Sequence, residues 1–226
     1  MICKSLQARA LKLGIPEDKI CMLRNGFNVI NWEPTTIKQA RRLLGIDISH
    51  LIIGYLGSFF PSDADLAARS LNLLRNYDPT IKFFHIGSSN IHIKNLVTDP
   101  NSVIETGAVG KEKIQFFLSA CDLLWLPLCD NPANAGRFPL KFTNYLSCGR
   151  PIIATDVGDL PKYIRKAKVG IVTKDNPEEF KEASIHILEN IEIQKQYGKN
   201  AINLSNKPSE SWASRAEQLI SLYKEV

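Results

Sequence analysis

The stretch LLWLPLCDNPANAGRFPLKFTNYLSCGRPIIAT, residues 123–155, decides the predicted fold. It opens with a short apolar run, Leu123–Leu126, and closes with another, Ile152–Thr155. Between them lie a polar, glycine-containing loop and a segment in which Phe142 and Leu146 fall at helical spacing. Short apolar runs bounded by turn residues indicate buried strands, and a strand-helix-strand unit favours a parallel sheet with right-handed crossovers.

The same alternation continues on both sides of this unit. Further apolar runs bounded by Gly, Pro or Asp predict strands at residues 20–23, 51–56, 82–86, 103–105 and 170–172. Helically spaced apolar residues occupy most of the intervening segments. We therefore predict an α/β fold, a doubly wound parallel sheet of Rossmann-like type with helices on both faces. Beyond residue 172 the pattern predicts three consecutive helices, at 177–190, 193–204 and 210–223.

The composition is that of a globular protein of 226 residues with 44% hydrophobic residues. No apolar run reaches the length needed to cross a bilayer, and no signal peptide is recognisable. The five cysteines form no CxxC pair and are interpreted as reduced, which indicates the cytoplasm. The net charge of +5 fits nucleotide ligands, an anionic membrane surface or simple solubility. The scattered histidines indicate no metal site, and no nucleic-acid-binding signature is present.

Three loops are expected at the carboxyl edge of the sheet, where open α/β sheets bind ligands. The first contains Gly57 and Ser58, and the second contains Gly87 and Ser88. The third is the polar loop of residues 127–141, after which a helix is expected to start near residues 138–139. Glycine lets a backbone approach a ligand closely, and the free amides of a helix start attract anions.

Two cations, Arg137 and Lys141, fall at this helix start, where the helix dipole disfavours positive charge. A bound anion such as a pyrophosphate would explain them. Lys141 can also be read as an ordinary solvated residue. We interpret His85 as a packed strand-end residue and Cys148 as a small core residue.

Seven segments occur in a fixed order along the chain: residues 24–28 (RNGFN), 56–58 (LGS), 84–87 (FHIG), 106–114 (TGAVGKEKI), 121–127 (CDLLWLP), 138–155 and 169–172 (VGIV). Each is a weak signal alone. In this order they resemble the C-terminal, donor-binding domain of group 1 (family 4) glycosyltransferases of the GT-B fold. The resemblance runs from about residue 5 to residue 223.

The resemblance implies a nucleoside-diphosphate sugar, such as a UDP- or GDP-sugar, as donor substrate, with no cofactor or metal required. Under the leading hypothesis of a glycosyltransferase, Arg137 and Lys141 compensate for the family's missing cations and act as catalytic residues on the leaving diphosphate, together with the helix-start amides. The residues that the resemblance implies for donor binding are Gly57, Ser58, Gly87, Ser88, Val109, Asn134, Gly136, Phe138 and Asn144.

The sequence departs from the family at the residues that usually surround the donor. The family has a pair of glutamates, and this chain has Gly136 and Asn144 in their places. Asn144 can still hydrogen-bond a ribose hydroxyl, but it is neutral. Ser58 replaces the family's arginine, and residues 62–65 lack its lysine.

The resemblance also implies that the acceptor-binding half is missing. Residues 1–18 are interpreted as a helix and linker left from that N-terminal domain, 19–208 as the nucleotide-sugar-binding domain, and 209–226 as a terminal helix that packs toward the missing domain. The expected partner is an N-terminal GT-B domain or a separate chain, and peripheral contact with the inner face of the membrane is a further expectation.

Two alternatives to a sugar-transferring enzyme remain open on the sequence. One is a non-catalytic nucleotide-sugar-binding or regulatory module, favoured by the missing acidic pair. The other is a scaffold that uses its exposed interface for protein contact, through residues 1–30 and 210–226. A sugar-nucleotide epimerase of similar architecture has no specific signal here.

Overall fold

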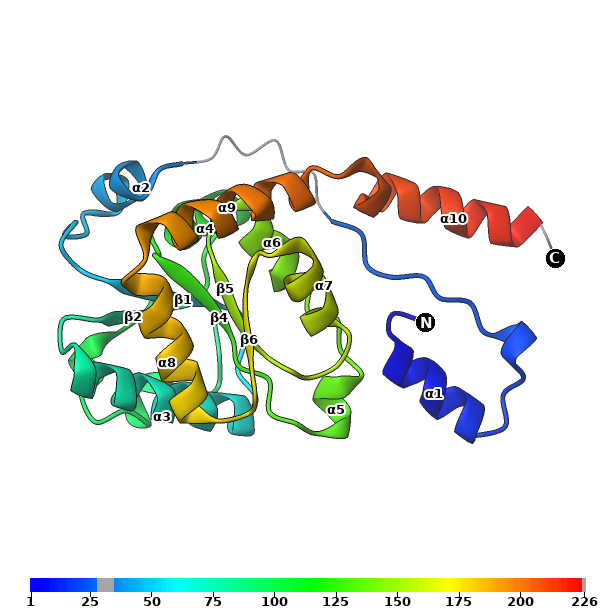
Figure 1. Cartoon of the computed structure of the whole chain (residues 1–226), viewed down its shortest axis with the longest axis horizontal. Helices are drawn as coiled ribbons and strands as arrows, with labels where there is room; N and C mark the ends of the chain where they lie inside the picture. Colours follow the sequence, from blue (N-terminus) through cyan, green and yellow to red (C-terminus); the bar gives the residue numbers. More distant parts are fainter. Residues whose placement is uncertain (28–34, 225–226) are drawn as a thin grey trace.

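The structure is a computed structural model and describes residues 1–27 and 35–224. One six-stranded sheet, paired in parallel throughout, has the order β3-β2-β1-β4-β5-β6 (Figure 1). This confirms the doubly wound α/β prediction, with the order reversing between β1 and β4. The strands are β1 (Ile52–Leu56), β2 (Lys82–Ile86), β3 (Val103–Glu105), β4 (Leu123–Leu126), β5 (Ile152–Thr155) and β6 (Gly170–Thr173).

Helices cover both faces of the sheet. One apolar core lies under α3 and α8, and a second lies under α4, α6, α7 and α9. The α-helices are α1 (Lys4–Lys12), α2 (Ile37–Leu44), α3 (Pro61–Tyr77), α4 (Lys111–Ser119), α5 (Pro132–Ala135), α6 (Lys141–Ser147), α7 (Leu160–Ala167), α8 (Pro177–Leu188), α9 (Ile191–Ser205) and α10 (Trp212–Lys224). Short 3-10 helices are η1 (Glu17–Lys19), η2 (Ile93–Asn95), η3 (Pro100–Ser102) and η4 (Pro208–Glu210).

The strand predicted at residues 20–23 is wrong. This segment is extended but pairs with no strand of the sheet. Its contacts are with the start of the chain: the amide of Leu23 donates to the carbonyl of Met1 at 2.8 Å, and the Met1 amino group donates to the carbonyl of Cys21. An apolar run predicts a strand only where a neighbouring strand can pair with it, and here none does.

The loop between β4 and α6 also differs from the prediction. The helix start expected near residues 138–139 lies at Lys141, where α6 begins. The preceding loop holds an unpredicted single turn, α5, whose N-cap is Asn131. The side chain of Asn131 accepts a hydrogen bond from the amide of Asn134 at 2.9 Å.

The two ends of the chain lie together outside the sheet (Figure 1). The predicted C-terminal helices are confirmed as α8, α9 and α10. The amide of Phe27 donates to the carbonyl of Glu210 at 2.6 Å, which ties the N-terminal segment to the start of α10. Beyond that point α10 extends away from the body, and none of its described residues is buried.

Two sequence features fall partly outside the described residues: Asn28 of the 24–28 motif, and residues 225–226 of the terminal segment. Within the described parts of the chain, no helix combines the length and the apolar character that a membrane crossing requires.

Candidate functional site

The carboxyl ends of β1 and β2 carry the two glycine loops predicted to meet a ligand. Gly57 has φ +91° and Gly87 has φ +109°, conformations that favour glycine. The loops touch: the amide of Gly57 donates to the carbonyl of Ile86 at 2.7 Å, and the hydroxyl of Ser58 donates to the carbonyl of Ser88 at 2.8 Å. The structure therefore brings Gly57, Ser58, Gly87 and Ser88 together at one sheet edge.

Lys141 is the first residue of α6, which follows β4 on the other side of the point where the strand order reverses. Its side chain extends to the carboxyl end of β1. Its Nζ lies 3.7 Å from the ring centroid of Tyr55 and 3.6 Å from the position that a Cβ on Gly57 would take. Burial, with help from the neighbouring Arg137, lowers the Lys141 pKa to about 7, and Asp63 opposes this shift. None of the ion pairs within the described residues involves Lys141.

Arg137 is held beside Lys141 by its own loop and by α3. Its guanidinium donates to Oδ1 of Asn134 at 2.7 Å, lies 3.5 Å from Oδ2 of Asp63, and stacks over Phe60 at 4.7 Å. Asp63 is buried and also accepts from the Asn134 amide group at 2.8 Å and from the amide of Cys129 at 2.9 Å. The position of Arg137 is therefore built into the fold.

Asn134, predicted to bind the donor, lies in the loop before Arg137. Its side chain is buried, with both its oxygen and its nitrogen bonded to protein groups. Its side chain links Arg137 to Asp63. Phe138 likewise has a buried ring, which packs edge-on against Phe142 and Tyr163.

The remaining predicted residues lie in or near the loop of residues 127–141 but form no side-chain hydrogen bond or ion pair with Lys141 or Arg137 in the described part of the chain. Asn144 lies about one turn after Lys141 on α6, half-buried, and its side chain makes no hydrogen bond to the described residues. Val109 is half-buried against the core under α4. Gly136 faces α1: a Cβ placed there would lie 3.2 Å from Leu6.

His85 is a packed residue, as interpreted from the sequence. Its ring is buried beside the stacked rings of Tyr55 and Phe59, and Nε2 lies 2.9 Å from the carbonyl oxygen of Gly57. Burial lowers the His85 pKa, which favours the neutral ring. A neutral imidazole that donates from Nε2 holds the Gly57 loop in place.

Sequence reasoning missed two residues of this site. Tyr55 forms the platform under the Lys141 amine, and Asp63 anchors Arg137. The sequence places Tyr55 only in the strand predicted at residues 51–56, and Asp63 only among residues 62–65, which lack the family's lysine. Within the described residues, no group of three or more His, Cys, Asp or Glu side chains is arranged to hold a metal ion.

Three comparisons with known proteins all find similarity to glycosyltransferases. The model for the glycosyl transferases group 1 family matches residues 50–190, which is more than half of the chain. The chain belongs to the group 1 glycosyltransferases. The matched region contains the whole sheet and every predicted site residue.

Two relatives in this family are distant in sequence. The glycosyltransferase MJ1178 of Methanocaldococcus jannaschii is 26% identical over 176 residues, which is 76% of this chain and 47% of that protein. TuaH of Bacillus subtilis, named for teichuronic acid biosynthesis, is 23% identical over 134 residues, 58% of this chain and 33% of that protein. The chain thus spans half or less of the length of these relatives.

Solved structures show the fold. Sucrose-phosphate synthase of Thermosynechococcus elongatus superposes with a TM-score of 0.81 at 20% identity, covering 100% of this chain and 57% of that one. HepE of Anabaena, solved in complex with UDP, gives 0.80 at 16% identity, covering 99% of this chain and 62% of that one. The fold is therefore that of one half of a GT-B glycosyltransferase.

Proposed function

We propose that this chain is the donor-binding half of a glycosyltransferase that uses a nucleoside-diphosphate sugar in glycan or polysaccharide synthesis. The observation that carries the proposal is the amine of Lys141, crowded by Arg137, next to the Gly57 loop and without an ion-pair partner in the described residues. A bound diphosphate would supply the missing negative charge. Family membership and the UDP and UDP-glucose complexes of HepE support the same ligand class.

The chemistry follows from this geometry. In transfer, the bond between the sugar's anomeric carbon and the diphosphate oxygen breaks, and the diphosphate keeps the electron pair. An acceptor oxygen forms the new bond to the anomeric carbon and gives up its proton to a base or to solvent. Arg137 and Lys141 stabilise the charge that develops on that oxygen, in surroundings where burial strengthens the interaction. The bound anion also raises the Lys141 pKa, so the amine is protonated at neutral pH when it is needed.

The acceptor half is proposed to come from elsewhere. The chain covers about three fifths of the solved glycosyltransferases it resembles. We infer that an N-terminal GT-B domain, in the same or another chain, supplies the acceptor site. The net charge of +5 and the five free cysteines favour a cytoplasmic location with access to an anionic membrane surface.

Calorimetric titration with UDP, GDP and their sugars tests donor binding. We expect saturable binding of at least one nucleotide, and a loss of about 10- to 100-fold in affinity for both Lys141→Met and Arg137→Met, because each removes a charge-assisted contact. Lys38→Met, an exposed lysine on α2, is the matched control and leaves affinity unchanged. A chain that binds none of these ligands contradicts the proposal.

A second candidate, a donor-binding module without turnover, is favoured by one observation. Gly136 stands where the family has a glutamate, and Leu6 of α1 covers it. An acid cannot act from that position in this chain. Transfer and hydrolysis assays with a supplied acceptor half separate the two candidates: binding without turnover supports the module, and turnover supports the enzyme.

A further inference from the structure

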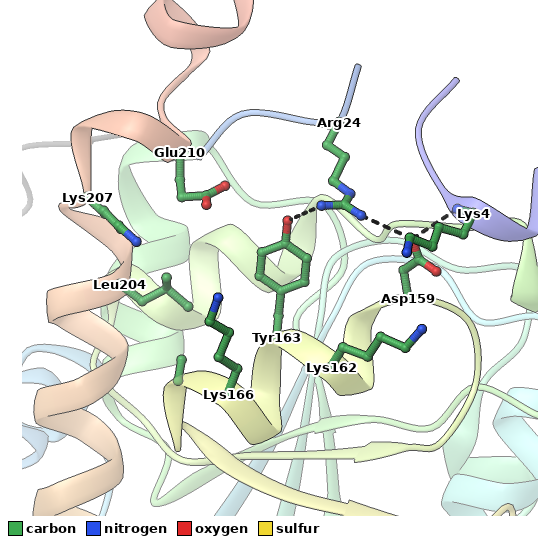
Figure 2. A pocket seen from close by; sticks show the side chains of 10 residues that line it. Lys4, Arg24, Asp159, Lys162, Tyr163, Lys166, Leu204, Lys207 and Glu210 are labelled. Carbon is green, nitrogen blue, oxygen red and sulfur yellow. Dashed lines mark hydrogen bonds and ion pairs between the residues drawn. The ribbon is translucent and has the colours of Figure 1, made fainter. Parts of the chain in front are cut away.

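A cavity lined by several charged side chains lies away from the Gly57 loop, between α7, the end of α9 and the N-terminal segment (Figure 2). Its volume is about 470 Å³, within the range of small-molecule sites. Figure 2 shows Lys166 of α7 and Lys207, beyond α9, extending toward the same space next to Tyr163 and Glu210.

The cavity has an excess of positive charge. Five of its lining side chains are cationic (Lys4, Arg24, Lys162, Lys166 and Lys207) and two are acidic (Asp159 and Glu210). Both acids are already engaged: Asp159 lies 3.6 Å from Arg24 and accepts from the amide of Lys4 at 3.0 Å, and Glu210 pairs with Arg215. Lys162, Lys166 and Lys207 have no ion-pair partner among residues 1–27 and 35–224. The cavity therefore lacks anions to match its cations.

Arg24 adds a second, independent observation. One of its terminal nitrogens donates to the hydroxyl of Tyr163 at 3.0 Å, and the other faces Asp159. Its Nε is buried and has no hydrogen-bond partner in the described chain. Buried donors are nearly always paired, and a guanidinium presents its donors in a fork that matches an oxyanion. An anion would supply both a hydrogen-bond acceptor for the unpaired Nε–H of Arg24 and a counter-charge for the unpaired lysines.

We propose that this cavity binds a phosphate group, as a site separate from the diphosphate site at Gly57. The cavity and the site at Gly57 are connected through contacts of Phe138. The Tyr163 ring that faces the cavity packs against Phe138 at 5.5 Å, and Asn25 donates to the carbonyl of Phe138 at 3.1 Å. Phe138 belongs to the loop that leads to Lys141. A ligand in the cavity would therefore contact residues that pack against this loop on the side away from Gly57. The proposal stands on its own lining residues and does not depend on donor binding.

Inorganic pyrophosphate, titrated at constant ionic strength into the 15N-labelled chain, tests the site by the amide shifts of the residues it moves. We expect saturable shifts at Tyr163, Lys166 and Leu204, and at least about tenfold weaker binding there in the Lys166→Gln/Lys207→Gln double variant. The Lys38→Gln/Lys199→Gln double variant has the same net charge, changes only exposed lysines elsewhere, and is expected to keep wild-type affinity at the cavity.

The same spectra separate this proposal from the donor site, because shifts at Gly57 and Lys141 report the latter. Co-sedimentation with phosphatidylcholine vesicles containing phosphatidic acid then identifies the source of the phosphate. Sedimentation that the Lys166/Lys207 variant loses and the control keeps indicates a lipid headgroup; shifts with pyrophosphate alone indicate a soluble ligand. The proposal is overturned if pyrophosphate gives no saturable shift at the cavity residues and sedimentation does not depend on Lys166 and Lys207. It is also overturned if the cavity residues shift only when an acceptor half is added.

Discussion

At the scale of single residues, the charged amine of Lys141 carries an energetic cost that a bound anion would relieve. Its amine has a pKa of about 7 because burial and Arg137 disfavour the charged form, and the ring of Tyr55 compensates only in part. Residues held at a cost in the folded protein are often those that a ligand site needs. The cluster at Gly57 fits that description.

This cost makes a prediction about stability and pH. The Lys141 pKa is 10.5 in an unfolded chain and about 7 in the folded one, so the unfolded chain binds more protons between these values and wild-type stability rises with pH across that window. The difference between these pKa values corresponds to about 5 kcal/mol, and the lost contact with the Tyr55 ring offsets part of it. Lys141→Met is therefore expected to stabilise the ligand-free chain by about 2 kcal/mol or more below pH 7, with the gain fading as pH rises toward 10.5.

Urea unfolding at several pH values measures this effect, with Lys38→Met as the control that changes stability little at any pH. A Lys141→Met variant that is less stable than wild type at pH 6 would show that the amine is not under strain.

The candidate residues were only partly predictable at this scale. The two cations and the glycine loops follow from strand ends that must meet at one edge of a parallel sheet. The roles of Asn134 and Asp63 do not, because they depend on a contact between two residues that are 71 positions apart. Sequence spacing gives no measure of such a contact, so the bonds that join Asn134 to Asp63 and Arg137 were not predictable.

At the scale of secondary-structure elements, α2 is joined to the sheet by one buried arginine. Arg41 donates to the carbonyls of Ala120, Ile48 and His50 and pairs with Asp122 at 2.7 Å. Asp122 also accepts from the amide of Ile52 at the start of β1. Removing one partner of such a pair leaves an uncompensated buried charge.

Arg41→Met is therefore expected to lower the free energy of unfolding by about 3–5 kcal/mol. Arg42→Met is the matched control: Arg42, next to Arg41 on the same helix, is exposed, and its replacement is expected to change stability by less than about 0.5 kcal/mol. Chemical denaturation measures both. Equal effects of the two substitutions would contradict the role given to Arg41.

Terminal helix α10 is expected to be weakly held in this chain. Its start is fixed by Phe27 and Ser211, but none of its described residues is buried, and a helix of 13 residues is marginal without tertiary packing. Its amides should exchange with deuterium far faster than those of α3, whose inner face is buried. Protection equal to that of α3 would show that α10 is stable without a partner.

The elements themselves were largely predictable, for a physical reason. Strands buried on both faces are uninterrupted apolar runs between turn residues, and all six strands of the sheet were found this way. The failure at residues 20–23 came from an apolar run with no strand to pair with. Helix α2 was overlooked although it carries a capping box, in which Thr36 and Gln39 bond each other's backbone amides.

At the scale of the whole molecule, the chain is a six-stranded Rossmann-like sheet with both ends of the chain outside it (Figure 1). Its strand order and family membership place the candidate site at the switch point between β1 and β4. The central claim is that this edge alone, without an acceptor half, binds a nucleoside diphosphate.

Titration of UDP into the 15N-labelled chain, followed by amide shifts, tests that claim most directly. We expect saturable shifts at the amides of Gly57, Ser58, Gly87 and Lys141, with Leu51 at the opposite end of β1 unmoved. Saturable binding that shifts only residues away from this edge, or no shift at all with UDP or GDP, would contradict the account.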